Sequence, residues 1–196
     1  MKLFPIKNTL FITILVFNTL LANDKEPKNL VGSPAPYWGL KTVEGEWERL
    51  GDYAAPMERN FEGERKVVVV SFFASWCQPC IKEIGELHKL NEEFKDEQVQ
   101  FFLINLTEYF RNKNNSPNKH IKAPGATQFL KNKGLMNITV LEDGNGRTAR
   151  KYNVTDVLPR LFVIDKYATI QLDKSGLCST CLKDEMEPLL EKLIAN

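Results

Sequence analysis

The run VVVVSFF at residues 67–73 constrains the fold more than any other stretch of the sequence. Its β-branched and aromatic residues follow one another without the regular polar alternation of a half-exposed strand. A continuous run of this kind is typical of a strand buried on both faces, at the centre of a sheet that helices cover. The run therefore predicts a central strand in a layered fold of sheet and helices.

An amphipathic helix follows this strand, with the motif CQPC in its first turn. Its apolar residues recur at spacings of three and four, with Lys, Glu and Asn between them: Ile81, Ile84, Leu87, Leu90 and Phe94. A strand that feeds directly into such a helix is the beginning of an α/β arrangement.

Further elements follow from local patterns. A hairpin is predicted around Glu44 and Gly45, and the last helix is predicted to begin with Asp184, followed three residues later by Glu187 in a capping-box-like start. Pro188 falls in the first turn of that helix, where proline costs little. Strands are predicted at 99–106, 138–143, 160–165 and 169–173, and a helix at 126–134. This order predicts an α/β or α+β sandwich with helices on a mixed sheet.

The N-terminus has the pattern of an export signal. Lys2 and Lys7 precede an apolar run at 9–22, and polar residues begin abruptly after Ala22. The run is shorter than the roughly 20 apolar residues that span a bilayer. A cleaved signal peptide, an uncleaved membrane anchor and a buried N-terminal helix are the three interpretations, and we favour export. Export places the cysteines where disulfide chemistry is permitted.

Length and charge bound the remaining organisation. The 196 residues suffice for one domain with a well-buried core, and a formal net charge of +1 argues against a dedicated nucleic-acid binder. The segment 107–125 is polar and has no periodicity, so it is predicted to be an insertion loop, either simply solvated or used for partner docking. The predicted organisation is a signal peptide or anchor at 1–22, a polar linker at 23–33 and one domain at 34–196.

The CQPC motif places two thiols where a thiolate is favoured. A cysteine at a helix N-terminus faces unpaired N–H groups and the positive end of the helix dipole. Cys77 occupies that position, and Cys80 lies about one turn further on, within reach of a disulfide. Pro79 suits the start of a helix because it has a fixed φ and donates no hydrogen bond. Trp76 can cover one side of the pair, so these neighbours are candidate substrate contacts.

Three segments carry a resemblance to a known family. VVVVSFFASWCQPCIKEI resembles the active-site segment of thioredoxin-fold proteins and is most similar to the exported TlpA/ResA group of thiol:disulfide oxidoreductases. VGSPAPYWGL resembles the first hairpin of that group, and VLPRLFVIDKYATI its cis-proline strand. The resemblance runs from about Val31 to the C-terminus, outside 107–125.

The resemblance implies a thioredoxin fold with an N-terminal β-hairpin extension. It implies attack by Cys77 on a substrate disulfide and resolution by Cys80, with no cofactor or metal beyond the redox-active disulfide. It further implies that Pro159 is cis and that the backbone of Leu158 pairs with the bound substrate strand.

Glu83 is the candidate proton acceptor. Cytoplasmic thioredoxins carry a buried aspartate six residues before the first cysteine, but this chain has Ser71 there, which cannot accept the proton of Cys80. A glutamate three residues after the second cysteine is common in the TlpA/ResA group, and Glu83 matches it, one helical turn from Cys80. The alternative for Glu83 is a surface carboxylate favoured by the helix dipole. Gly85 departs from the proline usual in the group, which puts the group's helix kink in doubt.

A second pair, Cys178 and Cys181, precedes the last helix. If the strand at 161–165 runs antiparallel to the first buried strand, the next strand, at 169–173, ends at the active-site edge beside Pro159. The second pair should then lie on the same side of the molecule as the first. A structural disulfide, a second exchange pair and a metal site remain open for it.

The predicted function is therefore an exported, periplasmic or otherwise extracytoplasmic thiol:disulfide oxidoreductase. Its expected partners are protein thiol and disulfide substrates, as in the reduction of haem-attachment cysteines during cytochrome c maturation, and a membrane electron donor. We expect a monomer and no nucleic-acid partner. The alternatives are a metal-binding or metal-delivery module that uses its thiols on copper, and a docking module that depends on its basic loop.

Overall fold

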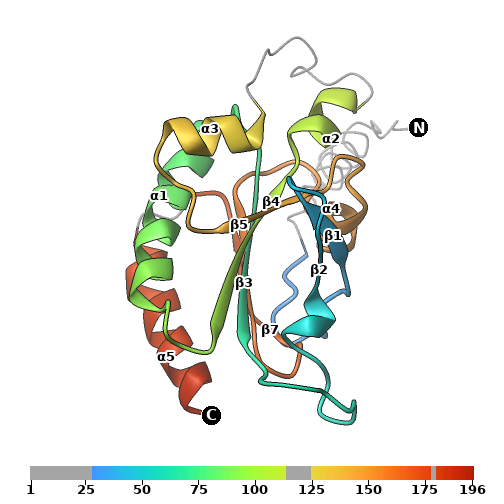
Figure 1. Cartoon of the computed structure of the whole chain (residues 1–196), viewed down its shortest axis with the longest axis vertical. Helices are drawn as coiled ribbons and strands as arrows, with labels where there is room; N and C mark the ends of the chain where they lie inside the picture. Colours follow the sequence, from blue (N-terminus) through green and yellow to red (C-terminus); the bar gives the residue numbers. More distant parts are fainter. Residues whose placement is uncertain (1–27, 114–124, 178–179) are drawn as a thin grey trace, which may run out of the picture.

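The computed structural model describes residues 28–113, 125–177 and 180–196. Their centre is a seven-stranded sheet with the order β2-β1-β5-β4-β3-β6-β7 (Figure 1). The strands are β1 (Gly39–Thr42), β2 (Trp47–Arg49), β3 (Val67–Phe73), β4 (Val99–Asn105), β5 (Thr139–Glu142), β6 (Arg160–Ile164) and β7 (Ile170–Ser175). The α-helices are α1 (Gln78–Glu93), α2 (Thr107–Asn112), α3 (Ala126–Asn132), α4 (Arg147–Lys151) and α5 (Glu187–Ala195).

Strand β3 is the central strand that the apolar run predicts. All seven of its residues are buried, and it pairs parallel with β4 and antiparallel with β6. Its burial on both faces explains why its sequence lacks the alternation of an edge strand. The carboxyl end of β3 therefore projects from the most rigid part of the sheet.

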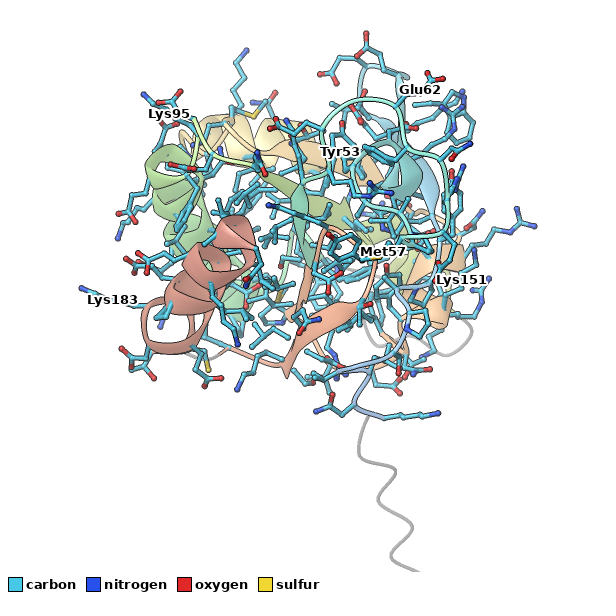
Figure 2. The ribbon with its side chains drawn as sticks, turned by 90° about the horizontal axis from the view of Figure 1, so that it is seen from below. Tyr53, Met57, Glu62, Lys95, Lys151 and Lys183 are labelled. Carbon is cyan, nitrogen blue, oxygen red and sulfur yellow. A yellow bond between two sulfur atoms is a disulfide. The ribbon has the colours of Figure 1, made fainter. Side chains whose placement is uncertain are left out.

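Helices cover both faces of the sheet, as the sequence predicts. Helices α1, α3 and α5 lie on one side, and α2 and α4 on the other (Figure 1). On the second side Phe72, Tyr152 and Phe162 contact one another ring to ring, with centroids 5.0 to 5.9 Å apart. Figure 2 shows Lys95, Lys151 and Lys183 on the periphery, pointing away from the sheet.

The N-terminal hairpin extends the sheet. Strands β1 and β2 pair antiparallel, and β1 pairs antiparallel with β5. The predicted signal or anchor at 1–22 and residues 23–27 of the predicted linker lie outside the described residues. The linker prediction is wrong for 28–33, because Leu30 is buried and the N–H of Gly32 donates to the carbonyl of Ile170 at 2.8 Å. Among the residues that the structure describes, no helix is long and apolar enough to cross a membrane.

The prediction of a structureless insertion at 107–125 is wrong for its first part. Thr107–Asn112 form helix α2, with Phe110 buried in the core on the α4 side of the sheet. Six residues are too few for a clear helical period, and this helix depends on packing rather than on intrinsic propensity. Helix α4 was also not predicted, because its sequence RTARK carries no apolar stripe. Residues 114–124 of the insertion lie outside the described residues.

The predicted start of the last helix is also wrong. Helical structure begins at Leu182 with a π-helical turn to Met186, so Asp184 lies inside this turn instead of capping it. The carbonyl of Thr180 accepts the N–H groups of Lys183 and Asp184 at 3.2 and 2.9 Å. The wide turn precedes Pro188, which has no N–H for an ordinary helical bond.

Helix α1 continues through Gly85 as one α-helix, and a methyl group added at Gly85 would meet no atom within 4 Å. Glycine in a helix interior has more unfolded-state entropy to lose than alanine. Gly85→Ala should therefore raise the free energy of unfolding by about 0.5–1 kcal/mol, measured by urea unfolding.

Gly146 is the matched control, because the same substitution should destabilise the protein there. Its φ is +65°, and the ring of Tyr109 on α2 fills the space that a methyl group would need. Gly146→Ala should lower the free energy of unfolding by about 1–3 kcal/mol. A neutral Gly146→Ala variant would contradict the account of how α2 packs against the start of α4.

Candidate active site

The Cys77–Cys80 pair sits at the start of α1, as predicted. Cys77 is the N-cap residue, and its Sγ accepts the backbone N–H of Cys80 at 3.2 Å. The two sulfur atoms form a disulfide, and Pro79 lies in the first turn. In the reduced protein this geometry directs helix N–H groups at the Cys77 sulfur, which favours its thiolate.

The pair is shielded by apolar side chains. Cys77 is 5% exposed and Cys80 is 1% exposed, whereas Gln78 and Pro79 between them are exposed. Trp76 is half-buried, packs against the core cluster that contains both cysteines, and meets the ring of Phe110 edge to face at 6.1 Å. Both cysteines are buried, and Cys77 is the slightly more exposed of the two, next to exposed Gln78 and Pro79.

The cis-proline loop lies at the same edge of the sheet. The Leu158–Pro159 peptide bond is cis, as the resemblance implies. Strand β6 begins at the next residue, Arg160, which pairs with Phe72 near the end of β3. Half-buried Leu158 and Trp76 pack against the same two core clusters.

A buried ion pair supports this loop, and the sequence patterns did not predict it. Arg160 Nη2 lies 2.6 Å from Asp173 Oδ1, and the two side chains are 4% and 0% exposed. Asp173 Oδ2 also accepts the backbone N–H of Leu30 at 2.8 Å. The pair therefore ties the start of β6 to β7 and to the N-terminal segment. The sequence feature that could have indicated this ion pair is the arginine that begins the otherwise apolar strand β6.

Glu83 is buried, and the interpretation as a surface carboxylate is wrong. Its side chain is on the buried face of α1, 3% exposed, and Glu83 Oε1 accepts a hydrogen bond from Ser71 Oγ at 2.6 Å. Burial raises the pKa of the Glu83 carboxyl to about 7, although the bond from Ser71 lowers it in part. An acid with this pKa can hold or release a proton at neutral pH.

The structure gives Ser71 a role that the sequence did not predict. The sequence identified it only as a residue unable to accept a proton, but its hydroxyl holds the carboxylate that α1 supplies. The buried carboxyl beside the middle of β3 therefore belongs to Glu83 on α1, and not to a residue of the strand itself. Cys80 and Glu83 lie one turn apart on the same buried face.

The second cysteine pair was predicted to follow a strand that ends at the active-site edge. The structure confirms this course for the strand, β7. Strand β7 runs antiparallel to β6, so that Ser175 pairs with Arg160 at the active-site edge. The N–H of Gly176 then donates to the carbonyl of Pro159 at 2.8 Å. Cys181 is buried and disulfide-bonded, whereas Cys178 lies outside the described residues. The role of this pair stays a prediction.

Other candidate groups are engaged elsewhere. His88, two turns beyond Cys80 on α1, is hydrogen-bonded through Nδ1 to Asn137 Oδ1. Within 28–113, 125–177 and 180–196, no cluster of three or more His, Cys, Asp or Glu side chains is arranged to hold a metal ion.

Comparison with known proteins agrees with this geometry. The sequence model of the AhpC/TSA family matches residues 31–172. Thiol-disulfide oxidoreductase ResA of Geobacillus kaustophilus (strain HTA426) is 27% identical over 163 residues, which cover 83% of this chain and 78% of that protein. Thioredoxin-like protein YneN of Bacillus subtilis (strain 168) is 29% identical over 160 residues, or 82% and 78% of the two chains. The crystal structure of a candidate thiol:disulfide interchange protein DsbE from Chlorobium tepidum matches with a TM-score of 0.63 at 24% identity, covering 83% and 97%.

The fold and the cysteine pair define a thioredoxin-like thiol:disulfide oxidoreductase, the class that the sequence predicts. The chain belongs to the AhpC/TSA family, and the match extends from the segment before β1 into β7.

The raised pKa of Glu83 makes stability depend on pH. Because the folded protein binds this proton more tightly than the unfolded chain, the contribution is complete below about pH 4.5 and is lost as pH rises through about 7. Glu83→Gln resembles the protonated acid and keeps an acceptor for Ser71. At pH 8 it should be about 1–3 kcal/mol more stable than the wild type, with no such gain near pH 4.

Urea unfolding across this pH range measures the effect. Glu86→Gln is the matched control, because Glu86 lies on the exposed face of the same helix, paired with Lys89 at 2.9 Å. A wild type and a Glu83→Gln variant with parallel pH profiles would contradict the burial of a titrating carboxyl at this position.

Proposed function

We propose that this protein is an exported thiol:disulfide oxidoreductase that reduces disulfides in partner proteins through Cys77 and Cys80. The observation that carries the proposal is the cysteine pair at the N-terminus of α1 with a buried carboxyl one turn below it. Reduction needs a nucleophilic thiolate, a resolving thiol and an acceptor for the proton of that thiol. Each of these three groups has a candidate on one face of α1.

In the first step the thiolate of Cys77 attacks one sulfur of a partner disulfide. An S–S bond forms between Cys77 and the partner, the partner's own S–S bond breaks, and its second sulfur leaves as a thiolate. The N–H groups at the start of α1 stabilise the attacking anion. Cys77 is suited to this role because exposed Gln78 and Pro79 adjoin it.

In the second step Cys80 resolves the mixed disulfide. The thiol of Cys80 gives its proton to the carboxylate of Glu83, and the resulting thiolate attacks the Cys77 sulfur. The Cys77–Cys80 disulfide forms, the bond from Cys77 to the partner breaks, and the partner sulfur that it held leaves as a thiolate and is protonated, so two electrons have passed to the partner. A dithiol on a membrane electron donor would return the protein to its reduced state.

The substrate strand is proposed to bind along the cis-proline loop. The backbone of Leu158 would pair with it, beside Pro159, Trp76 and Pro79. The buried pair of Arg160 and Asp173 supports this assignment because it anchors the residue that follows Pro159.

Export and reduction are proposed from different observations. The N-terminal pattern at residues 1–22 supports export to the periplasm or another extracytoplasmic compartment. The similarity to proteins named ResA supports action on protein thiols. Within that class, keeping haem-attachment cysteines reduced for cytochrome c maturation is the specific role that we propose.

A resolving-cysteine variant should trap the partners. In Cys80→Ser the mixed disulfide on Cys77 cannot be resolved, so covalent complexes should accumulate in cells and disappear on treatment with dithiothreitol. Non-reducing electrophoresis followed by mass spectrometry identifies them. Cys77→Ser is the control and should trap none. Equal trapping by both variants would contradict the assignment of Cys77 as the attacking residue.

Glu83→Gln should slow the resolving step. We expect a loss of about 100-fold in the rate of disulfide reduction near pH 7, the lower end of general acid–base contributions. The rate of the wild type should also rise through about pH 7 as the carboxyl ionises, and this step should be absent in the variant. Stopped-flow measurements with a disulfide peptide separate the two steps. Glu86→Gln should behave as the wild type, and unchanged kinetics in Glu83→Gln would remove Glu83 from the mechanism.

A further inference from the structure

A chain of hydrogen bonds reaches the cysteine loop from the start of α2 and the ends of β4 and β5. Thr107 Oγ1, at the start of α2, accepts the backbone N–H of Ser75 at 2.9 Å. Thr107 Oγ1 also donates to Asn105 Oδ1 at 2.6 Å, and the N–H of Thr107 donates to the same oxygen at 3.0 Å. Asn105 Nδ2 in turn donates to the carboxylate of Glu142, at 2.9 and 3.2 Å from its two oxygens.

The inner end of this chain lies beside the attacking cysteine. Ser75 is two residues before Cys77, in the turn where the N–H of Cys77 donates to the carbonyl of Ala74 at 2.9 Å. Ser75, Asn105 and Thr107 are each 4% exposed, so water cannot readily replace the bonds that they make. The backbone N–H of Ser75 donates to a side chain rather than to a neighbouring strand.

Helix α2 holds Thr107 in place from two directions. Phe110 meets the ring of Trp76, the residue between Ser75 and Cys77. Tyr109 packs on Gly146, where the left-handed backbone and the absence of a Cβ let the ring approach. The helix is therefore fixed between the cysteine loop and the start of α4.

The outer end of the chain lies at the surface. Glu142 is half-buried, and it lines a cleft of about 700 Å³ between the hairpin strand β1 and α4. Burial raises the pKa of Glu142, whereas the hydrogen bonds from Asn105 lower it. The carboxylate thus completes a row of polar groups that leads from this cleft to the cysteine loop.

We propose that Thr107 and Asn105, supported by Glu142, are positioning residues for the thiol exchange. Their bonds hold the backbone of Ser75 so that Cys77 keeps its N-cap geometry at the start of α1. Without the Thr107 hydroxyl the buried N–H of Ser75 loses its acceptor, and the turn shifts to satisfy it. The Cys77 sulfur then aligns less well with the helix N–H groups, and its thiolate is less favoured. The inference rests on the proposed function, in which Cys77 is the attacking residue.

Thr107→Val tests the inference, because valine matches threonine in shape but has no hydroxyl. In the reduced protein we expect the midpoint pH of iodoacetamide alkylation at Cys77 to rise by about 0.5 unit, and alkylation at pH 6.5 to slow about 3-fold. Cys80→Ser as a common background leaves Cys77 as the reacting thiol of the active-site pair, and peptide mass spectrometry follows its modification. Thr107→Ser keeps the hydroxyl and should restore the wild-type midpoint.

Thr42→Val is the matched control for stability. The hydroxyl of buried Thr42 accepts the N–H groups of Glu44 and Glu46 in the hairpin turn, at 3.2 and 3.3 Å. This variant should lose stability as Thr107→Val does, yet leave the alkylation midpoint unchanged. A shift of equal size in both variants would mean that the midpoint follows stability alone, and it would overturn the inference.

An unchanged midpoint in folded Thr107→Val would also overturn the inference. If that variant does not fold, Asn105→Ala takes its place, and an unchanged midpoint there has the same meaning. Alkylation needs no turnover, so this result stands apart from the proposed function. A protein that reduced no partner disulfide but showed the shift would refute the function and leave the positioning of Cys77 in place.

Discussion

The burial of strand β3 on both faces is the constraint on which the rest of the structure depends. The strand lies between β4 and β6, and all seven of its residues are buried. Its carboxyl end is therefore held in position, and the turn that follows delivers Cys77 to the start of α1 at a fixed place. The parallel neighbour β4 brings Asn105 to the same edge, and antiparallel β6 brings Pro159 there. Three adjacent strands therefore bring polar groups and the cis-proline to the edge where the cysteine pair lies.

The burial of β3 also determines the environment of the Glu83 carboxyl. At the position where cytoplasmic thioredoxins carry an aspartate, β3 has Ser71. The carboxylate is instead supplied by Glu83 on α1, and the Ser71 hydroxyl donates a hydrogen bond to it. A buried carboxyl without a cationic partner is favoured in its protonated form, which is why its pKa is raised. In the proposed reduced state, the site combines a Cys77 thiolate favoured by helix N–H groups with a carboxyl whose pKa burial raises to about 7.

The sequence predicted those parts of the molecule that local patterns encode. The apolar run of β3, the period of α1 and the strand directions around Pro159 were each read from a short stretch, and the structure confirms them. The contact of Ser71 with Glu83 was missed because it joins two elements at the tertiary level. Thr107 was assigned to a loop because a six-residue helix shows no clear period, yet its hydroxyl bonds Ser75 across 32 positions of sequence. Side-chain hydrogen bonds between distant segments leave no spacing rule in the sequence.

The central claim is that a buried, titrating carboxyl lies beneath the cysteine pair and serves the exchange. Its most direct test is a titration of Glu83 followed by the chemical shift of its side-chain carboxyl carbon in isotopically labelled, oxidised protein. Comparison with Glu83→Gln assigns the signal. The account predicts a midpoint near pH 7. A midpoint near 4.5, the ordinary value for an exposed glutamate, would contradict it.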